Sequence, residues 1–166
     1  MGQAEGSADG ERQLIREFGR SLREARKRAG LSQAEVATRL GIGQSYVSRV
    51  ERGAQNITLS HCVRFAQAVG CTFSTEFTPP RPRDNDSDSS IAEFARRLRE
   101  ERRRAGLSQA ELAARLGMTQ GYLSRVERGA QNISLSACEA FATAVGCMFS
   151  VAVTRNPRDR GGSSQE

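Results

Sequence analysis

Four stretches between residues 13 and 71 carry apolar side chains at helical spacing, and a glycine follows each of them. The stretches run over about residues 13–29, 32–40, 44–52 and 59–69. The first should bury Ile15, Phe18 and Leu22, which recur every three to four positions. Because a glycine after the last apolar residue is typical of a left-handed helix cap, the pattern predicts four helices.

After the fourth of these glycines, Gly70, helical spacing gives way to strict alternation. Phe73, Thr75 and Phe77 alternate with more polar neighbours, which is typical of a short strand. A lone strand leaves its backbone N–H and C=O groups without partners. The pattern therefore also predicts a second strand to pair with the first.

The whole pattern occurs twice in the chain. Residues 15–77 and 91–153 align at a constant offset of 76 without a gap, and 43 of the 63 aligned pairs are identical. A repeat of this length indicates two small domains of one fold. The second alternating segment contains Phe149, Val151 and Val153. We therefore expect a mainly α protein in which the two strands pair as an antiparallel ribbon that joins the copies.

The segments outside the repeat lack the apolar residues that a packed core requires. The segment between the copies contains three prolines followed by Asp, Asn and Ser residues. The residues at both ends of the chain are mostly small and polar. The sequence thus predicts a disordered tail (1–12), a first domain (13–77), a linker (78–90), a second domain (91–153) and a disordered basic tail (154–166).

The second and third predicted helices of each copy form a helix-turn-helix candidate. Ser32 and Glu35 form the pattern of a capping box at the start of the second helix, as do Ser108 and Glu111 in the second copy. A short turn with Gly41 then leads to the third helix, which is the arrangement of a helix-turn-helix. The alternative is any small helical bundle with a glycine turn, but both copies fill the apolar contact positions of the motif.

The net charge is +6 at pH 7 and the isoelectric point is about 9.9. Most of the positive charge falls within the two copies, as expected for a partner that is a polyanion. A surface that merely keeps a small domain soluble would give the same balance. No apolar run approaches the roughly 20 residues of a membrane span, and the N-terminus has no secretory signal pattern. We therefore expect a cytoplasmic protein.

The four cysteines form two repeated pairs, Cys62 with Cys71 and Cys138 with Cys147. No Cys-x-x-Cys spacing occurs, and Ala137 stands where the first copy has the single histidine, so we expect neither a metal site nor a cofactor. Buried thiols that act as small apolar side chains are the favoured interpretation. A disulfide between the copies or a thiol sensor remains as an alternative.

Each copy resembles the Cro/CI-type (XRE-family) helix-turn-helix domain of phage and bacterial repressors. The resemblance covers nearly all of 13–71 and 89–147 and rests on LSQAEVATRLGIGQSYVSRVERG and LSQAELAARLGMTQGYLSRVERG. The segment NITL, followed by a helix and a strand, is similar to HipB-type antitoxin repressors, whose terminal strands pair across a dimer. The resemblance implies that this dimer is built into one chain.

In this family the second helix of the motif enters the major groove of DNA with its N-terminal residues toward the bases. The resemblance implies that the base-reading positions are Gln44, Ser45 and Arg49 in the first copy and Gln120, Gly121 and Arg125 in the second. The implied phosphate contacts are Ser32, Gln33, Tyr46, Arg52, Asn56, Ser108, Gln109, Tyr122, Arg128 and Asn132. The tyrosines could equally pack against the protein. The family also pairs Glu51 with Arg26 and Glu127 with Arg102 as structural ion pairs.

The second copy departs from the first at the proposed reading helix. Gly121 replaces Ser45 and offers no side chain to a base, and Thr119 replaces Gly43 at the helix start. We therefore expect the two half-sites of the DNA to differ at one or two base pairs.

These observations favour a sequence-specific regulator of transcription. We expect a repressor that acts as a single-chain pseudodimer and binds an inverted-repeat operator in the nucleoid. An activator is not excluded by the sequence. A second hypothesis is an antitoxin-like or adaptor module whose main partner is a protein. An enzyme is disfavoured, because the sequence shows no phosphate loop and no repeated nucleophile–base pair. The copies could also pair with those of another chain, which would give a homodimer in place of a monomer.

Overall fold

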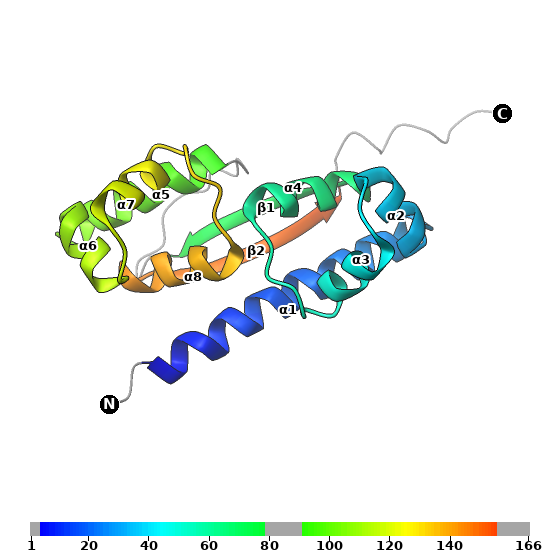
Figure 1. The fold of residues 1–166 in the computed structure, drawn as a ribbon, viewed down its shortest axis with the longest axis horizontal. Helices are drawn as coiled ribbons and strands as arrows, with labels where there is room; N and C mark the ends of the chain where they lie inside the picture. Colours follow the sequence, from blue (N-terminus) through cyan, green and yellow to red (C-terminus); the bar gives the residue numbers. More distant parts are fainter. Residues whose placement is uncertain (1–3, 79–90, 156–166) are drawn as a thin grey trace.

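The computed structural model describes residues 4–78 and 91–155, which form eight helices and two strands (Figure 1). In the first copy the elements are α1 (Ala4–Arg28), α2 (Gln33–Leu40), α3 (Gln44–Glu51), α4 (Leu59–Ala68) and β1 (Cys71–Thr78). In the second they are α5 (Ile91–Arg104), α6 (Gln109–Arg115), α7 (Gln120–Glu127), α8 (Leu135–Ala144) and β2 (Met148–Arg155). The two helical units lie at opposite ends of the long axis, and the strands run between them. No helix within the described ranges is long and apolar enough to cross a membrane.

The predicted capping boxes fix where α2 and α6 begin. The Ser32 hydroxyl accepts the Glu35 N–H, and the Glu35 carboxylate accepts the Ser32 N–H at 2.7 Å. Ser108 and Glu111 repeat this arrangement in the second copy. Such a box satisfies N–H groups that have no partner within the helix. The first turn of the helix-turn-helix is therefore set by local sequence.

The helices of the two copies pack around one continuous core, to which both contribute. The side chains that are at most 1% exposed include Phe18, Leu22, Val47 and Phe65 in the first copy and Phe94, Leu98, Leu123 and Phe141 in the second. One detail of the predicted core is wrong. Leu14 is buried, whereas Ile15 is only partly buried and packs at the margin of the core.

The ribbon relates the copies by an approximate two-fold axis. β1 and β2 pair in antiparallel register with Thr75 opposite Val151, and these two residues are equivalents at the offset of 76. A second pair of equivalents, Thr58 and Ser134, forms an isolated antiparallel bridge. The axis therefore passes between both pairs. The predicted ribbon is confirmed, and its strands extend to Thr78 and Arg155, positions that the sequence had placed in the linker and the tail.

The N-terminal segment departs from the prediction. Residues 4–12 are the start of α1 and not a disordered tail, so α1 has 25 residues against 14 in α5. The additional turns lie along α8 and β2 of the second copy (Figure 1). Extension of an existing helix needs no new nucleation, which explains why small polar residues continue it here. The predicted linker beyond Thr78 and the tail beyond Arg155 lie outside the described residues.

Gly10 marks a close approach within this contact. A Cβ atom added at Gly10 would lie 2.4 Å from the Glu139 Oε1 atom of α8. α1 therefore connects the two copies on one side, in addition to the ribbon.

Candidate nucleic-acid interface

The predicted base-reading residues share one exposed side of α3. Gln44, Ser45 and Arg49 are exposed, whereas Val47 and Val50 on the opposite side are at most 1% exposed. The buried valines hold α3 against α1 and α2. The sequence thus divides this helix into a side fixed in the core and a side free to contact a partner.

α7 repeats this division in the second copy. Gln120, Gly121 and Arg125 are exposed, and Leu123 and Val126 are buried. The starts of the two helices differ, however. The Thr119 hydroxyl accepts the Tyr122 N–H at 3.2 Å, whereas Gly43 gives α3 no side-chain cap. The first turn of α7 therefore has a side-chain cap that α3 lacks. The same turn contains Gly121, which has no side chain to read a base.

Each exposed arginine lies over a tyrosine ring. The guanidinium carbon of Arg49 is 5.6 Å from the ring centre of Tyr46, and that of Arg125 is 5.8 Å from the ring centre of Tyr122. Tyr46 in turn stacks on Phe65 with ring centres 6.3 Å apart. A cation above an aromatic ring is attracted to it. The half-buried tyrosines therefore restrict where the two arginine side chains can lie.

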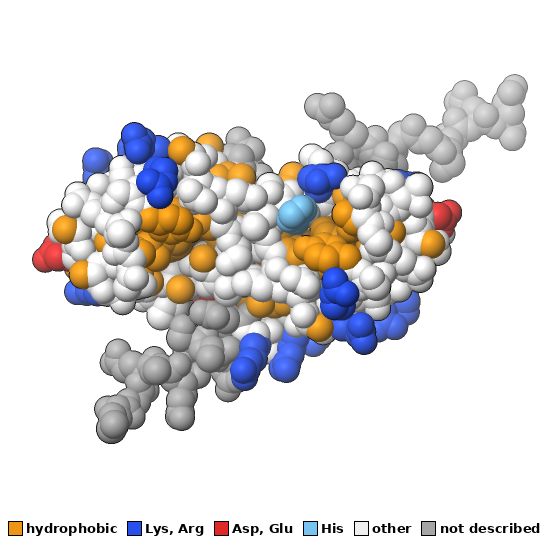
Figure 2. Space-filling view, viewed as in Figure 1, with side chains coloured by type: hydrophobic (Ala, Val, Ile, Leu, Met, Phe, Trp, Pro, Cys, Tyr) orange, Lys and Arg blue, Asp and Glu red, His pale blue; other side chains and the backbone are white. Residues whose placement is uncertain are grey.

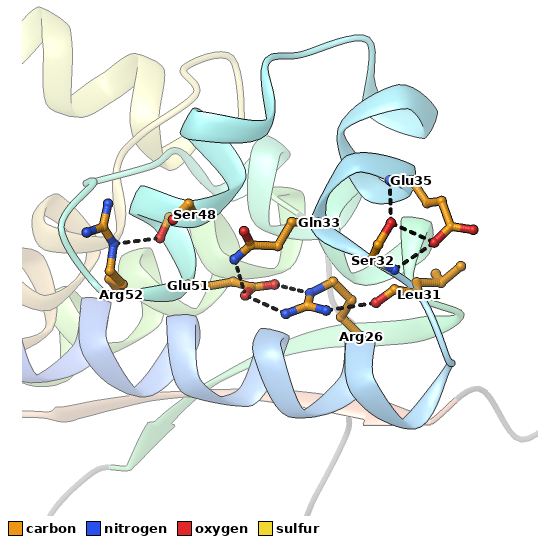
Figure 3. Close-up of polar contacts among 8 residues, drawn as sticks. All are labelled: Arg26, Leu31, Ser32, Gln33, Glu35, Ser48, Glu51 and Arg52. Atoms are coloured by element: carbon orange, nitrogen blue, oxygen red, sulfur yellow. Dashed lines mark hydrogen bonds and ion pairs between the residues drawn. The ribbon is translucent and has the colours of Figure 1, made fainter.

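The carboxylate of Glu51 points into the protein and not toward the exposed side (Figure 3). Arg26 donates from Nε to Oε1 at 2.6 Å and from Nη2 to Oε2 at 3.0 Å. Arg26 also donates to the Leu31 carbonyl at 2.7 Å, and Gln33 donates to Oε2 at 2.9 Å. One carboxylate thus connects α1, α2 and α3.

The second copy contains the same network around Glu127. Arg102 donates to Oε1 at 2.5 Å and to Oε2 at 3.0 Å, and Gln109 donates to Oε2 at 2.8 Å. Both ion pairs named from the resemblance are therefore present. The glutamines, which the resemblance had assigned to phosphate contacts, use a side-chain N–H inside this network.

Burial by itself would raise the pKa of the Glu51 carboxyl, because the charged form loses water. The hydrogen bonds from Arg26 and Gln33 and the charge of Arg26 outweigh burial, so the pKa lies below its ordinary value of 4.5. The pKa of Glu127 is lowered in the same way by Arg102 and Gln109. Both carboxylates are therefore charged at neutral pH.

Two predicted phosphate contacts lie at the seam between the copies. The side-chain amide of Asn132 donates to Thr58 Oγ1 at 3.0 Å and to Ser60 Oγ at 2.6 Å. That of Asn56 donates to Ser136 Oγ at 2.7 Å. Each asparagine therefore binds the start of the last helix in the other copy. Sequence reasoning missed this role because the partners are more than 70 positions away.

The remaining predicted phosphate contacts lie at the ends of the motif helices. Ser32 and Ser108 are the exposed N-caps of α2 and α6, and Arg52 and Arg128 follow the last residues of α3 and α7. Both arginines are exposed. On the side drawn in Figure 2, basic side chains occur on both helical units, while acidic ones show mainly at the two ends. This distribution is suited to a polyanion.

All four cysteines are buried free thiols. Burial raises the pKa of Cys62 and Cys138, and burial together with Glu101 raises that of Cys147 to about 11. Because the thiolate is the reactive form, these raised pKa values make the three thiols less reactive at neutral pH. Cys62 and Cys138 fit the interpretation of small apolar side chains, whereas Cys147 also contacts a carboxylate.

Comparison with known proteins matches each copy to a helix-turn-helix family. The family described as "Helix-turn-helix" matches residues 22–75, and the family described as "Helix-turn-helix domain" matches residues 93–150. Both matches contain the complete two-helix motif of their copy. No solved structure gives a significant match.

Two relatives match at 38% identity. One, over 61 residues, is an uncharacterized HTH-type transcriptional regulator (y4dJ) of Sinorhizobium fredii, with 37% of this chain and 79% of the relative aligned. The other, over 63 residues, is a "Neisseria hypothetical transcription factor" of Neisseria meningitidis serogroup B, with 38% of this chain and 59% of the relative aligned. Each alignment is about as long as a single copy. The chain thus belongs to the helix-turn-helix transcriptional regulators, and it carries two XRE-type domains of that family in tandem.

Proposed function

We propose that this chain is a sequence-specific double-stranded DNA-binding repressor, in which one polypeptide does the work of a dimer. The observation that carries the proposal is the approximate two-fold axis through the Thr58–Ser134 and Thr75–Val151 pairs. It relates two helices, α3 and α7, whose exposed sides carry a glutamine and an arginine at equivalent positions. A pair of readers related by two-fold symmetry matches an inverted repeat in DNA.

The reading chemistry follows from the exposed side chains. Glutamine can bind adenine through two hydrogen bonds, and arginine can bind guanine in the same two-pronged manner. Each such pair discriminates by about 1–3 kcal/mol against a wrong base. Gln44 and Arg49 would supply these contacts from α3, and Gln120 and Arg125 from α7. We expect the half-site centres to lie about 34 Å apart, one turn of B-form DNA.

Phosphate contacts would set the register of the protein on DNA without reading its sequence. Ser32 and Ser108, which are exposed N-caps, would make these contacts together with the exposed Arg52 and Arg128. With six to ten such contacts, affinity should fall by about 10³–10⁵ between 50 and 200 mM salt. A protein bound in this way at a promoter blocks transcription by occupying the site.

The decisive experiment begins with selection of preferred sites from random double-stranded DNA, followed by fluorescence anisotropy on the selected operator. Arg49→Ala and Arg125→Ala should each weaken specific binding by roughly 10-fold or more, corresponding to the loss of about one base contact. Their binding to unrelated DNA should change little. Together the two changes should reduce operator binding to the non-specific level.

A charge-preserving control separates base reading from simple attraction. Arg49→Lys keeps the positive charge but loses the planar fork that matches guanine, so it should lose specificity while its salt dependence stays unchanged. Light scattering of the complex should show one 18.1 kDa chain per operator. Two chains per operator would contradict the single-chain arrangement. Selection that enriches no DNA sequence would contradict the whole proposal and favour the adaptor hypothesis.

A further inference from the structure

A cavity of about 270 Å³ lies where α1, α2 and the end of the ribbon meet. Its walls come from the last turn of α1, the side of α2, the turn between α4 and β1, and the last residue of β2. The lining residues are Ala25, Arg28, Ala29, Leu31, Arg39, Val69, Gly70, Cys71 and Arg155. Because β2 belongs to the second copy, both halves of the chain form this cavity.

Three exposed arginines and six small or apolar residues line this space. Arg28, Arg39 and Arg155 supply the charges, while Val69 and Cys71 are less than 10% exposed. Arg39 is held in place by a 2.7 Å hydrogen bond from its Nη1 to the Ala68 carbonyl. None of the three arginines forms an ion pair with a carboxylate of residues 4–78 or 91–155. Glu35, one turn before Arg39 on α2, interacts with Arg39 only through a weak electrostatic attraction.

The second copy has a carboxylate, Glu101, at the position equivalent to Ala25. Seven of the nine lining positions have the same residue in both copies, and the two exceptions are Ala25, which becomes Glu101, and Arg155, which becomes Pro79. The Glu101 carboxylate forms an ion pair with Arg104, the equivalent of Arg28, and accepts a hydrogen bond from the Cys147 thiol at 3.8 Å. The second copy thus carries its own carboxylate, whereas the first has a methyl group and a third arginine.

We propose that the cavity of the first copy binds a small organic carboxylate. Guanidinium groups bind carboxylates through paired, charge-assisted hydrogen bonds, and Glu101 occupies the equivalent place in the second copy. The volume lies just below the range of about 300–1,000 Å³ that is usual for small-molecule sites. Three positive charges from three elements match a compact di- or tricarboxylate.

The test uses citrate, a compact tricarboxylate, titrated into the full chain by calorimetry at constant ionic strength and without DNA. We expect one citrate per chain with a dissociation constant below about 1 mM, and a rise in melting temperature that follows the citrate concentration. Ala25→Glu supplies the internal carboxylate that the second copy already tolerates among the same neighbours. It should therefore fold normally and bind citrate at least 10-fold more weakly.

Matched arginine variants locate the site. Arg155→Ala removes the charge that only the first copy has and should weaken citrate binding several-fold. Arg115→Ala removes the equivalent of Arg39 from the second copy and should leave citrate binding unchanged. Absence of citrate binding, equal binding by the Ala25→Glu variant, or an equal loss in Arg115→Ala would each overturn the proposal.

Inorganic phosphate and sulfate, titrated under the same conditions, distinguish carboxylate recognition from general attraction of anions. Either one binding as tightly as citrate would overturn the assignment of a carboxylate. Because these titrations contain no DNA, their result does not depend on whether the chain binds an operator.

Discussion

Arg26 and Glu51 meet in a two-pronged ion pair that fixes the end of the proposed reading helix α3 to α1. The Glu51 side chain is 2% exposed, and its second oxygen also accepts a hydrogen bond from Gln33. Removal of one partner of such a pair leaves a buried charge without compensation. The position of α3 therefore depends on this carboxylate.

We predict that Glu51→Ala lowers the free energy of unfolding by about 3 kcal/mol, measured by urea denaturation. Glu127→Ala should have a similar effect, because Arg102 and Gln109 surround Glu127 in the same way. The control is Arg96→Ala, which removes an exposed arginine from its ion pairs with Glu93 and Glu100 on the same helix and should cost far less. An equal cost for the buried and exposed pairs would contradict the prediction.

The carboxylates of Glu51 and Glu127 should make the free energy of unfolding depend on pH. The pKa values of Glu51 and Glu127 are below the ordinary value of 4.5, so the folded state favours their charged forms. Their contribution is therefore fully present above pH 4.5 and is lost as the pH falls through the lower folded pKa values. Urea denaturation should show a steady loss of stability below about pH 4.5. The double variant Glu51→Gln, Glu127→Gln should lose less stability over this range, and an unchanged slope would refute the assignment.

Gly19 offers a test in which two physical effects have opposite signs. Helix propensity alone predicts that Gly19→Ala stabilises α1 by roughly 0.5–1 kcal/mol. A Cβ atom at Gly19 would, however, lie 2.4 Å from the Val50 carbonyl oxygen of α3. We expect the clash to dominate and Gly19→Ala to destabilise the chain by about 1–3 kcal/mol.

The second copy supplies the comparison for this change, because Ala95 stands at the equivalent position with 1% exposure. Its presence shows that α5 and α7 accommodate a methyl group there. Ala95→Gly should therefore destabilise only modestly, through lost burial and helix propensity, by about 1 kcal/mol. Thermal denaturation measures the effect. A higher melting temperature for Gly19→Ala would contradict the prediction, because it would mean that α1 and α3 move apart to accept the methyl group.

The seam asparagines should contribute unequally to stability. Asn132 makes three hydrogen bonds across the seam, including one that accepts the Ser60 N–H at 3.3 Å, whereas Asn56 makes one. We predict that Asn132→Ala costs about 1–2 kcal/mol in urea denaturation and that Asn56→Ala costs less. If both variants kept full stability but lost DNA affinity, the phosphate role named from the resemblance would be favoured over the seam role.

If the chain binds DNA as proposed, α3 and α7 should prefer DNA half-sites of different sequence. Ser45 of α3 can reach a base with its hydroxyl, whereas Gly121 of α7 cannot. Site selection with the unchanged protein should return an inverted repeat with one or two mismatched positions. The variant Gly121→Ser should return a more symmetric repeat. A perfect palindrome for the unchanged protein would contradict this expectation.

Local sequence determined much of the fold. The capping boxes at Ser32 and Ser108 place the helix starts, and the alternation around Phe73 predicts the strand, because these signals depend on neighbours within a few positions. The pairing of β1 with β2 followed from a general requirement, since an isolated strand cannot satisfy its backbone groups.

Features that depend on distant residues were missed. Residues 4–12 extend α1 toward α8 of the other copy, a contact that no nearby residue encodes. The seam role of Asn132 depends on Thr58 and Ser60, and the cavity beside Ala25 depends on where the end of β2 lies. In each case the relevant partner belongs to the other copy, so its position follows only from the assembled fold.

Since β1 and β2 belong to one polypeptide, the pairing of the two halves involves no encounter between separate molecules. A tethered partner acts at an effective concentration that can reach about 1 mM, so the paired form should persist at very low cellular abundance. If the chain acts alone, as proposed, mixed assemblies of mutant and normal subunits do not arise either. Each half can therefore accumulate changes independently, and a tandem gene of this kind can acquire an asymmetric target one substitution at a time.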